Sequence, residues 1–427
     1  MTDATANAAR AQSGGFMKQA TIWIVAAVLL MILPQIFNSG SSLTIMNAMA
    51  ITIVFALAYN MLLGQGGMLS FGHAVYMGLG GFLVMHLMNY IEEYSLPIPL
   101  PMLPIFGGLF GMFFASLIGL FQTRNAGTVF AMISLGVGEL IAACSIIITT
   151  FFGGEEGISG DRTMGLPTFG VEFLHQIEVY YLIAFWMFIS TLGMFLYSRT
   201  PIGRMANAVR DNPERAEFLG YSARWVRYVS FVFSGFFCGV AGALFAINFE
   251  ILTEENLNAT QSGVILLVAF LGGVGIFAGP IVGAVVFTLL QTVLSLHTEL
   301  WALYLGSMFL ATVMFFPQGL TGLIMMHVGP WKLGNMGKLV VPYIKTILPG
   351  MVGVLGVVFL MEIIVHMREA AEGDDMMSIF GIDFSSHSPL AWIICGALAL
   401  GGILIARANA PELRQTWHEA STPGGAK

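Results

Sequence analysis

Few side chains in this sequence could carry chemistry, and two of them lie inside apolar stretches. Glu139 stands in MISLGVGELIAAC, where a carboxylate is costly unless it is paired, protonated or in contact with water. His73 lies in GQGGMLSFGHAVYMGLGGF, residues 64–82, together with Gln65 and Ser70, which hydrocarbon packing does not require. A role in transport and a buried hydrogen bond to a neighbouring helix explain Glu139 equally well. A single histidine is more often packed or hydrogen-bonded than a ligand or a base.

The motifs of enzymes and of nucleotide-binding proteins are absent from the sequence. It contains no GxxxxGK(S/T) phosphate loop, no HExxH, no GxSxG and no pair of aspartates within an apolar stretch. The eight histidines include no i, i+4 pair that could hold a metal, and Cys144, Cys238 and Cys395 lack the spacing of a zinc site. We therefore expect no catalytic residue, no metal and no cofactor. An enzyme embedded in the membrane is the least favoured hypothesis.

The elements that must position these side chains are membrane helices. The chain of 427 residues is 57% hydrophobic and only 10% charged, with a mean hydropathy of +0.82, so a soluble core could not bury its apolar residues. We predict an all-α polytopic membrane protein with about 10–12 transmembrane or re-entrant helices. Twelve apolar stretches are candidate spans, and the first lacks a cleavage site after it, which indicates an uncleaved span.

A polar segment, residues 198–227, interrupts the apolar sequence and contains six of the 17 lysines and arginines. A Thr-Pro pair at 200–201 predicts one capped helix, and an Asn-Pro pair at 212–213 predicts a second that ends at Gly220. Two capped helices between membrane spans could act as a rigid lever that carries motion from a soluble partner into the membrane. A basic loop that only fixes the topology is the alternative.

Two glycine-rich stretches interrupt apolar runs, one at 64–82 and one at 271–284, LGGVGIFAGPIVGA. Glycine at this density lets helices approach closely, or breaks a helix so that its backbone faces a cavity. Broken segments in corresponding places of two halves are typical of a substrate pathway, and close helix packing is the alternative, which we favour for the second stretch. The candidates for the substrate pathway are Gln65, Gly67, Ser70, Gly72, His73, Glu139, Gly272 and Gly273.

The distribution of basic residues predicts the orientation. With the N-terminus in the cytoplasm, fifteen of the 17 lysines and arginines fall on the cytoplasmic side, and only Arg162 and Arg368 fall outside. The polar segment 198–227 then faces the cytoplasm. The outer loops are acidic, which the depletion of lysine and arginine outside explains.

At these same residues the sequence resembles the membrane permease subunits of branched-chain amino acid ABC importers, specifically the M-type subunit. The first glycine-rich stretch is similar to the family's Gly-x-x-Gly-x-x-Ser-x-Gly-His pattern, and Glu139 falls where that family tends to carry a glutamate. The block from Pro201 to Ala246 resembles the permease loop whose short coupling helix lies in the cleft of an ATPase subunit. The resemblance assigns to this coupling loop Gly203, Arg204, Ala208, Arg210, Asp211, Asn212, Pro213, Ala216 and Gly220.

The resemblance covers about residues 43 to 323 and stops beyond them. We therefore divide the chain into an N-terminal tail with the first transmembrane helix (1–42), an ABC importer permease core (43–323), and a C-terminal extension with two further predicted transmembrane helices (324–427).

The resemblance implies a transport subunit that does no catalysis itself. It would pair with a homologous H-type permease, two cytoplasmic ABC ATPases and a periplasmic solute-binding protein, in the lipid of a bacterial inner membrane and without nucleic acid. The solute would be a branched-chain amino acid or a related small molecule. The alternative is a stand-alone secondary transporter or channel for a small solute or ion that uses Glu139.

Overall fold

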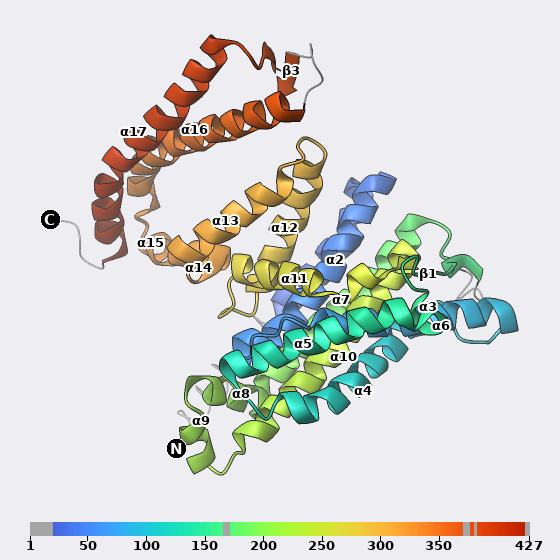
Figure 1. Cartoon of the computed structure of the whole chain (residues 1–427). Coiled ribbons are helices and arrows are strands. Elements are labelled where there is room, and N and C mark those ends of the chain that lie inside the picture. Colours follow the sequence, from blue (N-terminus) through green and yellow to red (C-terminus); the bar gives the residue numbers. More distant parts are fainter. Residues whose placement is uncertain (1–19, 165–170, 370–375, 380–381, 423–427) are drawn as a thin grey trace. The chain divides into compact units, whose positions relative to one another are not determined.

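The computed structural model describes residues 20–164, 171–369, 376–379 and 382–422 (Figure 1). Within these ranges the chain is helical apart from two small antiparallel sheets of two strands each. It divides into two compact units, Met1–Leu289 and Leu290–Lys427. The N-terminal tail and Lys427, which entered the prediction of orientation, lie outside the described residues.

The first unit contains most of the apolar helices. Its elements are the first helix (Ala20–Ile36), α2 (Gly40–Asn60), η1 (Met61–Gln65), α3 (Ala74–Tyr94), η2 (Leu100–Met102), α4 (Leu103–Gln122), α5 (Gly127–Ile147), α6 (Thr149–Phe152), β1 (Ile158–Ser159), η3 (Arg162–Met164), α7 (Gln176–Arg199), α8 (Pro201–Asp211), α9 (Pro213–Phe218), α10 (Ala223–Phe249), β2 (Ile251–Leu252), η4 (Glu254–Asn256), α11 (Ala259–Gly272) and α12 (Gly279–Ser295), which crosses into the second unit.

The core of the first unit is organised around α10. Its most apolar window is 78% buried, and the helix packs against α2, α3 and α4. Glycines allow this close approach: a methyl group at Gly242 would overlap the carbonyl oxygen of Met77 on α3, and one at Gly239 would overlap that of Gly107 on α4. Backbone contact of this kind is how membrane helices gain packing energy, because lipid provides no hydrophobic driving force between them.

The second unit is a set of helices, with two paired strands between the last two of them. It contains α13 (Trp301–Phe315), α14 (Gly319–Met326), α15 (Val328–Lys332), α16 (Met336–Glu369), β3 (Met376–Ile379), β4 (Ile382–Ser385) and α17 (Pro389–Ser421). α16 and α17 run antiparallel in close contact at Gly353, Gly356 and Gly402, and the Glu362 carboxylate on α16 accepts hydrogen bonds from the hydroxyls of Thr298 and Tyr304 at 2.6 and 2.7 Å.

The prediction of an all-α polytopic membrane protein is confirmed. Eight helices in the described ranges are long and apolar enough to cross a membrane, or nine if the bent pair Trp301–Phe315 and Gly319–Lys332 is one span. The first helix, α11 and α12 are apolar but shorter. These helices occupy the twelve stretches that the sequence indicated. The predicted boundary between 323 and 324 lies inside α14, whereas the compact units divide at 289, and the three-part division stays a proposal based on resemblance.

Candidate functional site

The predicted pair of capped helices in the polar segment is confirmed. Thr200 Oγ1 accepts a hydrogen bond from the Gly203 amide at the start of α8, and Asn212 Oδ1 accepts one from the Arg215 amide at the start of α9. α9 ends at Phe218, and the chain then turns at Gly220, whose φ of +88° is left-handed and favours glycine. Caps at both starts fix the two helices as one rigid loop.

This loop has its own small core. Ala206, Val209 and Ala216 pack with two residues at the start of α10, Ala223 and Val226. Of the other residues predicted for the coupling loop, Gly203 lies against the backbone of α7, whereas Arg204, Asp211, Asn212 and Pro213 are exposed and Ala208 is half-buried. Phe218, the last residue of α9, is 91% exposed, so the loop presents an apolar side chain that the described residues do not cover.

The first glycine-rich stretch is a real break in the helical structure. α2 ends in a π-helical turn, η1, and residues 66–73 form no regular element before α3 begins. Gly67 has a left-handed φ of +66°. π turns inside membrane helices are rare and often occur at functional sites, because the wider turn weakens the regular ladder of hydrogen bonds.

His73 lies at the end of this break and is completely buried. Its Nε2 is 2.8 Å from Ser234 Oγ on α10, and that hydroxyl lies 2.6 Å from the Ala58 carbonyl oxygen, to which it donates. Because the serine has only one proton to donate, His73 Nε2 must be the donor in the first contact. Nδ1 is then an acceptor, and it has no hydrogen-bond partner among the described residues.

Further buried polar atoms lie in the π turn and the irregular segment, or directly before them in the chain. In the part of the chain that the structure describes, Asn60 Oδ1, Gln65 Oε1 and Ser70 Oγ lack hydrogen-bond partners. The Tyr59 hydroxyl donates to the Ser70 carbonyl oxygen at 2.9 Å, which holds the irregular segment against α2. Buried acceptors without partners are uncommon in proteins, so their concentration at one break marks a place where water or a polar solute can bind.

The structure joins the break to the coupling loop through Arg210 on α8. Its Nη1 donates to the carbonyl oxygen of Gly64, in the π turn, and its aliphatic stem packs on Gly67. Its Nε pairs with Asp211 at 2.9 Å. Gly64 also lies against the carbonyl oxygen of Val274, in the turn between α11 and α12. Two predicted groups of residues, from segments about 140 residues apart in the chain, therefore meet at one point.

The other pathway candidates lie in different surroundings. Gly72 lies against α5, where the Ser134 hydroxyl accepts a hydrogen bond from the Phe71 amide at 2.9 Å. Glu139, also on α5, is exposed and makes no ion pair or hydrogen bond within the described residues. Gly272 packs against the backbone of Gly279 at the turn into α12, as the favoured hypothesis of close helix packing predicts, and Gly273 has a φ of +117°.

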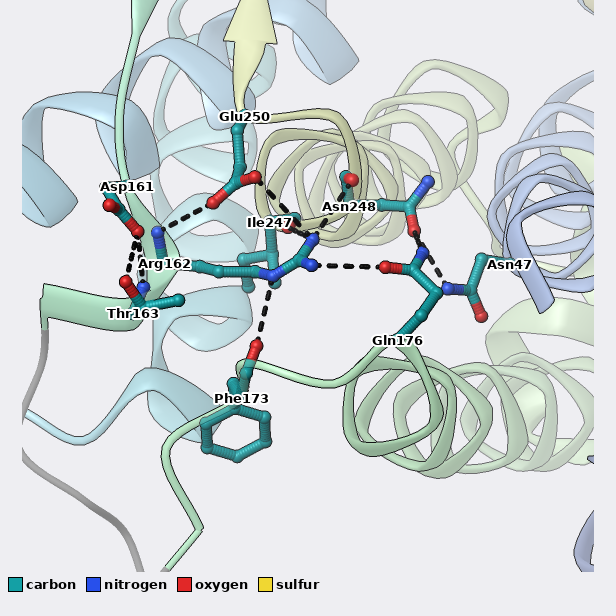
Figure 2. A network of polar contacts seen from close by, with 9 residues as sticks. All are labelled: Asn47, Asp161, Arg162, Thr163, Phe173, Gln176, Ile247, Asn248 and Glu250. Atoms are coloured by element: carbon teal, nitrogen blue, oxygen red, sulfur yellow. Dashed lines mark hydrogen bonds and ion pairs between the residues drawn. The ribbon is translucent and has the colours of Figure 1, made fainter. Parts of the chain in front are cut away.

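Sequence reasoning missed a second polar network, centred on Arg162 at the opposite end of α10 (Figure 2). The Arg162 guanidinium donates to the carbonyl oxygens of Phe173, Ile247 and Asn248 at 3.2, 3.4 and 3.3 Å. It also pairs with Glu250 at 3.8 Å, and the same carboxylate accepts a hydrogen bond from the Arg162 amide at 3.0 Å. With 11% of its side chain exposed, Arg162 holds the segment between α6 and α7 against the end of α10.

This network continues into α2 and α7. Gln176, at the start of α7, accepts from Arg162 at 3.1 Å and donates to Asn248 Oδ1 at 3.2 Å. The same oxygen accepts from Asn47 on α2 at 2.8 Å (Figure 2). The sequence contained one signal that could have indicated this network: Arg162 is one of only two basic residues that the charge distribution predicts on the outer side. Nearby, Asp161 accepts two hydrogen bonds from Thr163, and these lower the pKa of its carboxyl below the ordinary value.

Comparisons with known proteins show the family to which the sequence belongs. Residues 41–316 match the family model described as branched-chain amino acid transport system / permease component. The high-affinity branched-chain amino acid transport system permease protein LivM of Escherichia coli (strain K12) is 26% identical over 328 residues, which cover 72% of this chain and 76% of LivM. No solved structure matches.

Two other relatives carry different names. The galactose/methyl galactoside import permease protein MglC of Escherichia coli (strain K12) is 25% identical over 300 residues, 65% of this chain and 86% of MglC. The autoinducer 2 import system permease protein LsrC of Klebsiella pneumoniae is 31% identical over 118 residues, 26% of this chain and 34% of LsrC. Similarity therefore extends to permeases named for chemically different solutes.

Proposed function

The chain belongs to the branched-chain amino acid permease family of ABC importers, and from that premise we propose that it forms half of a translocation pathway driven by ATPases on separate chains. As a family member it is a transport subunit and a multi-pass protein of the inner membrane. The proposal adds a mechanism: nucleotide-driven motion enters through the α8–α9 loop and reaches the pathway at the break after α2.

The observation that carries this proposal is the contact of Arg210 with the π turn. The loop is rigid, because both helices are capped and share a core with α10, so a force applied at its exposed tip moves Arg210 as part of one body. Arg210 holds the carbonyl oxygen of Gly64, which belongs to the weakest turn of α2. The movement therefore arrives where the backbone can change conformation at low cost.

The segment that would respond contains the buried acceptors. A shift of the π turn moves Gln65 and Ser70 relative to His73, which Ser234 fixes to α10. Alternating access requires an element that can adopt two conformations, with an equilibrium that both the ATPases and the bound solute can shift. The break supplies it, and α10 is the fixed reference.

Glu139 supports the pairing with a second permease. Its carboxylate lies on the exposed face of α5, roughly 12 Å from the end of a helix long enough to span the membrane. A carboxylate facing hydrocarbon costs about 2.5–3.5 kcal/mol or more. We propose that a homologous H-type permease covers this face, so that Glu139 meets water or solute at the boundary between the two subunits.

The proposed solute is a branched-chain amino acid or a related small molecule. The extent of similarity to LivM supports the first choice, and the galactose and autoinducer permeases among the relatives support the wider class. A periplasmic binding protein would deliver the solute, and the N-terminus would be cytoplasmic, as the distribution of basic residues predicts.

The test is R210Q in the assembled transporter, reconstituted in vesicles with its ATPases and binding protein. We expect solute uptake to fall by about tenfold or more while the ATPases still copurify, because the charge-assisted contact with the π turn is lost. R124Q, which removes an exposed arginine at the end of α4, is the matched control. Normal uptake by R210Q would refute the mechanism, and uptake without any ATPase would support a secondary transporter.

A further inference from the structure

A cavity of about 590 Å³ lies between the first helix, α2, α7 and α12 of the first unit. None of the polar residues of the break at His73 lines it. Its walls are aliphatic and aromatic, with Leu30 and Met49 among them. Ile22 and Leu29 also line it and are 68% and 53% exposed, so the first helix is on the side of the unit that meets lipid.

The cavity lies along the contact between the first helix and α7. Near the start of the first helix the Trp23 ring packs edge-on against Phe188 and Phe195, with centroids 5.6 and 5.4 Å apart. Farther along the first helix the Tyr180 hydroxyl donates to the carbonyl oxygen of Leu30 at 3.0 Å. The lining also includes two alanines, Ala26 on the first helix and Ala184 on α7, whose small side chains leave space between the helices.

One charged group stands at the end of this apolar space. Of the described residues that line the cavity, Arg199 alone is charged, and its guanidinium lies 4.9 Å from the centre of the Phe195 ring. Arg199 is the last residue of α7, so it lies where that helix leaves the membrane. The α7 residues that line the cavity run from Tyr180 to Arg199, about 28 Å along the helix axis.

The lining also contains one hydroxyl without a partner. Thr191 is 7% exposed, and its Oγ1 makes no hydrogen bond within the part of the chain that the structure describes. The described residues that line the cavity offer no carboxylate to an ammonium group, so a zwitterionic amino acid would leave one of its charges unpaired. An occupant with a long apolar part and an anionic end fits the apolar walls and the single arginine.

We propose that this cavity holds an acyl chain of an anionic phospholipid whose phosphate pairs with Arg199. The volume is within the range of about 300–1,000 Å³ typical of ligand sites. Basic pockets between membrane helices on the cytoplasmic side are known to bind anionic head groups, and arginine suits phosphate because its donors form a planar fork. The lipid fills the gap between the first helix and α7, beside Thr200, where the coupling loop begins.

The test uses the purified full chain in a neutral detergent, titrated with dioleoyl phosphatidylglycerol or with dioleoyl phosphatidylcholine, which has the same chains. Native mass spectrometry counts bound lipid, and the midpoint of thermal unfolding reports stabilisation. We expect phosphatidylglycerol to bind about five- to tenfold more tightly than phosphatidylcholine, and R199Q to abolish that preference. R224Q, an exposed arginine on α10 that does not line the cavity, should keep it.

Filling the cavity separates a bound chain from surface adsorption. A26F and A26L place larger side chains in the space, and we expect them to lower binding of both lipids while the protein unfolds cooperatively. A184L is a second variant from α7 should the first helix tolerate no change. Equal binding of the two lipids by the wild type, or full binding by the filled variants, would overturn the proposal. So would a dimer that the filled variants dissociate, because a second copy would then be the occupant.

Discussion

Gly72→Ala tests how the break is held against α5. A methyl group at Gly72 would overlap the carbonyl oxygen of Ser134 and lie 3.2 Å from the Gly138 amide nitrogen. These are backbone atoms that no rotamer change can move, so α5 must shift by about 1 Å to restore normal contact. Overpacking of this kind costs roughly 1–3 kcal/mol, and the shift also weakens the hydrogen bond from Phe71 to Ser134 by about 1 kcal/mol. We expect a loss of about 2–4 kcal/mol.

The assay is unfolding of the isolated chain in mixed micelles, followed by circular dichroism. Gly136→Ala is the control, because it adds the same methyl group to α5, the helix that Gly72 contacts, at a position where no atom outside the neighbouring turns of that helix lies within 4 Å. It should be neutral or more stable by up to about 1 kcal/mol, since alanine favours the helix. If Gly72→Ala and Gly136→Ala were equally stable, the close contact between the break and α5 would be refuted.

Two further predictions concern Arg162, the centre of the second polar network, and its neighbour Asp161. R162Q should lower the free energy of unfolding by about 2–4 kcal/mol, because buried carbonyl groups and Glu250 lose their donor, whereas R368Q at an exposed position should change it by less than about 0.5 kcal/mol. Asp161 has a lowered pKa in the folded chain, so its stabilising effect is present above its ordinary pKa and disappears as the pH falls through the folded value. Hydrogen exchange should then show that the Thr163 amide keeps its protection at the ordinary pKa of aspartate and loses it only at lower pH, and D161N should lack this pH dependence.

Local rules predicted the coupling loop because its structure is set within a few residues. Thr200 and Asn212 each precede a proline, and both side chains form the expected caps. The left-handed residue at Gly220 follows from the same kind of reasoning, since glycine adopts that conformation without strain. Nothing distant needs to be known for any of these features.

Hydropathy was a weaker guide to the length of the helices. α11 has 14 residues and rises about 21 Å, which is less than the roughly 30 Å of a bilayer core. An apolar run reports that a segment avoids water, and it does not report where tertiary contacts stop the helix. Here the stop is at Gly272 and Gly273, where the backbone of the α12 turn leaves no room for a side chain.

The site depended on contacts that sequence spacing does not contain. Gln65, Ser70 and His73 could be selected because their polarity is unexpected in an apolar stretch. That Arg210 would hold the π turn, or that Arg162 would join α2, α7 and α10, required the fold. Whether Glu139 is buried or exposed could not be predicted either, because α5 has apolar side chains on all of its faces and the sequence does not indicate which face packs against the protein.

The two polar networks and the glycines between them determine which part of the first unit can move. Ser234 connects α10 to the break, and Asn248 connects it to the polar network centred on Arg162. Between these two residues the glycines of α10 are in backbone contact with α3 and α4. Helices whose backbones are in contact cannot shift past one another without overlap, so we expect α3, α4 and α10 to move as one rigid body. In the proposed mechanism, motion that enters beside α10 from the α8–α9 loop is absorbed where regular structure is interrupted, and the π turn with residues 66–73 is the interruption that the loop contacts through Arg210. We therefore expect the contact of Arg210 with Gly64 to determine whether motion of the loop reaches the break.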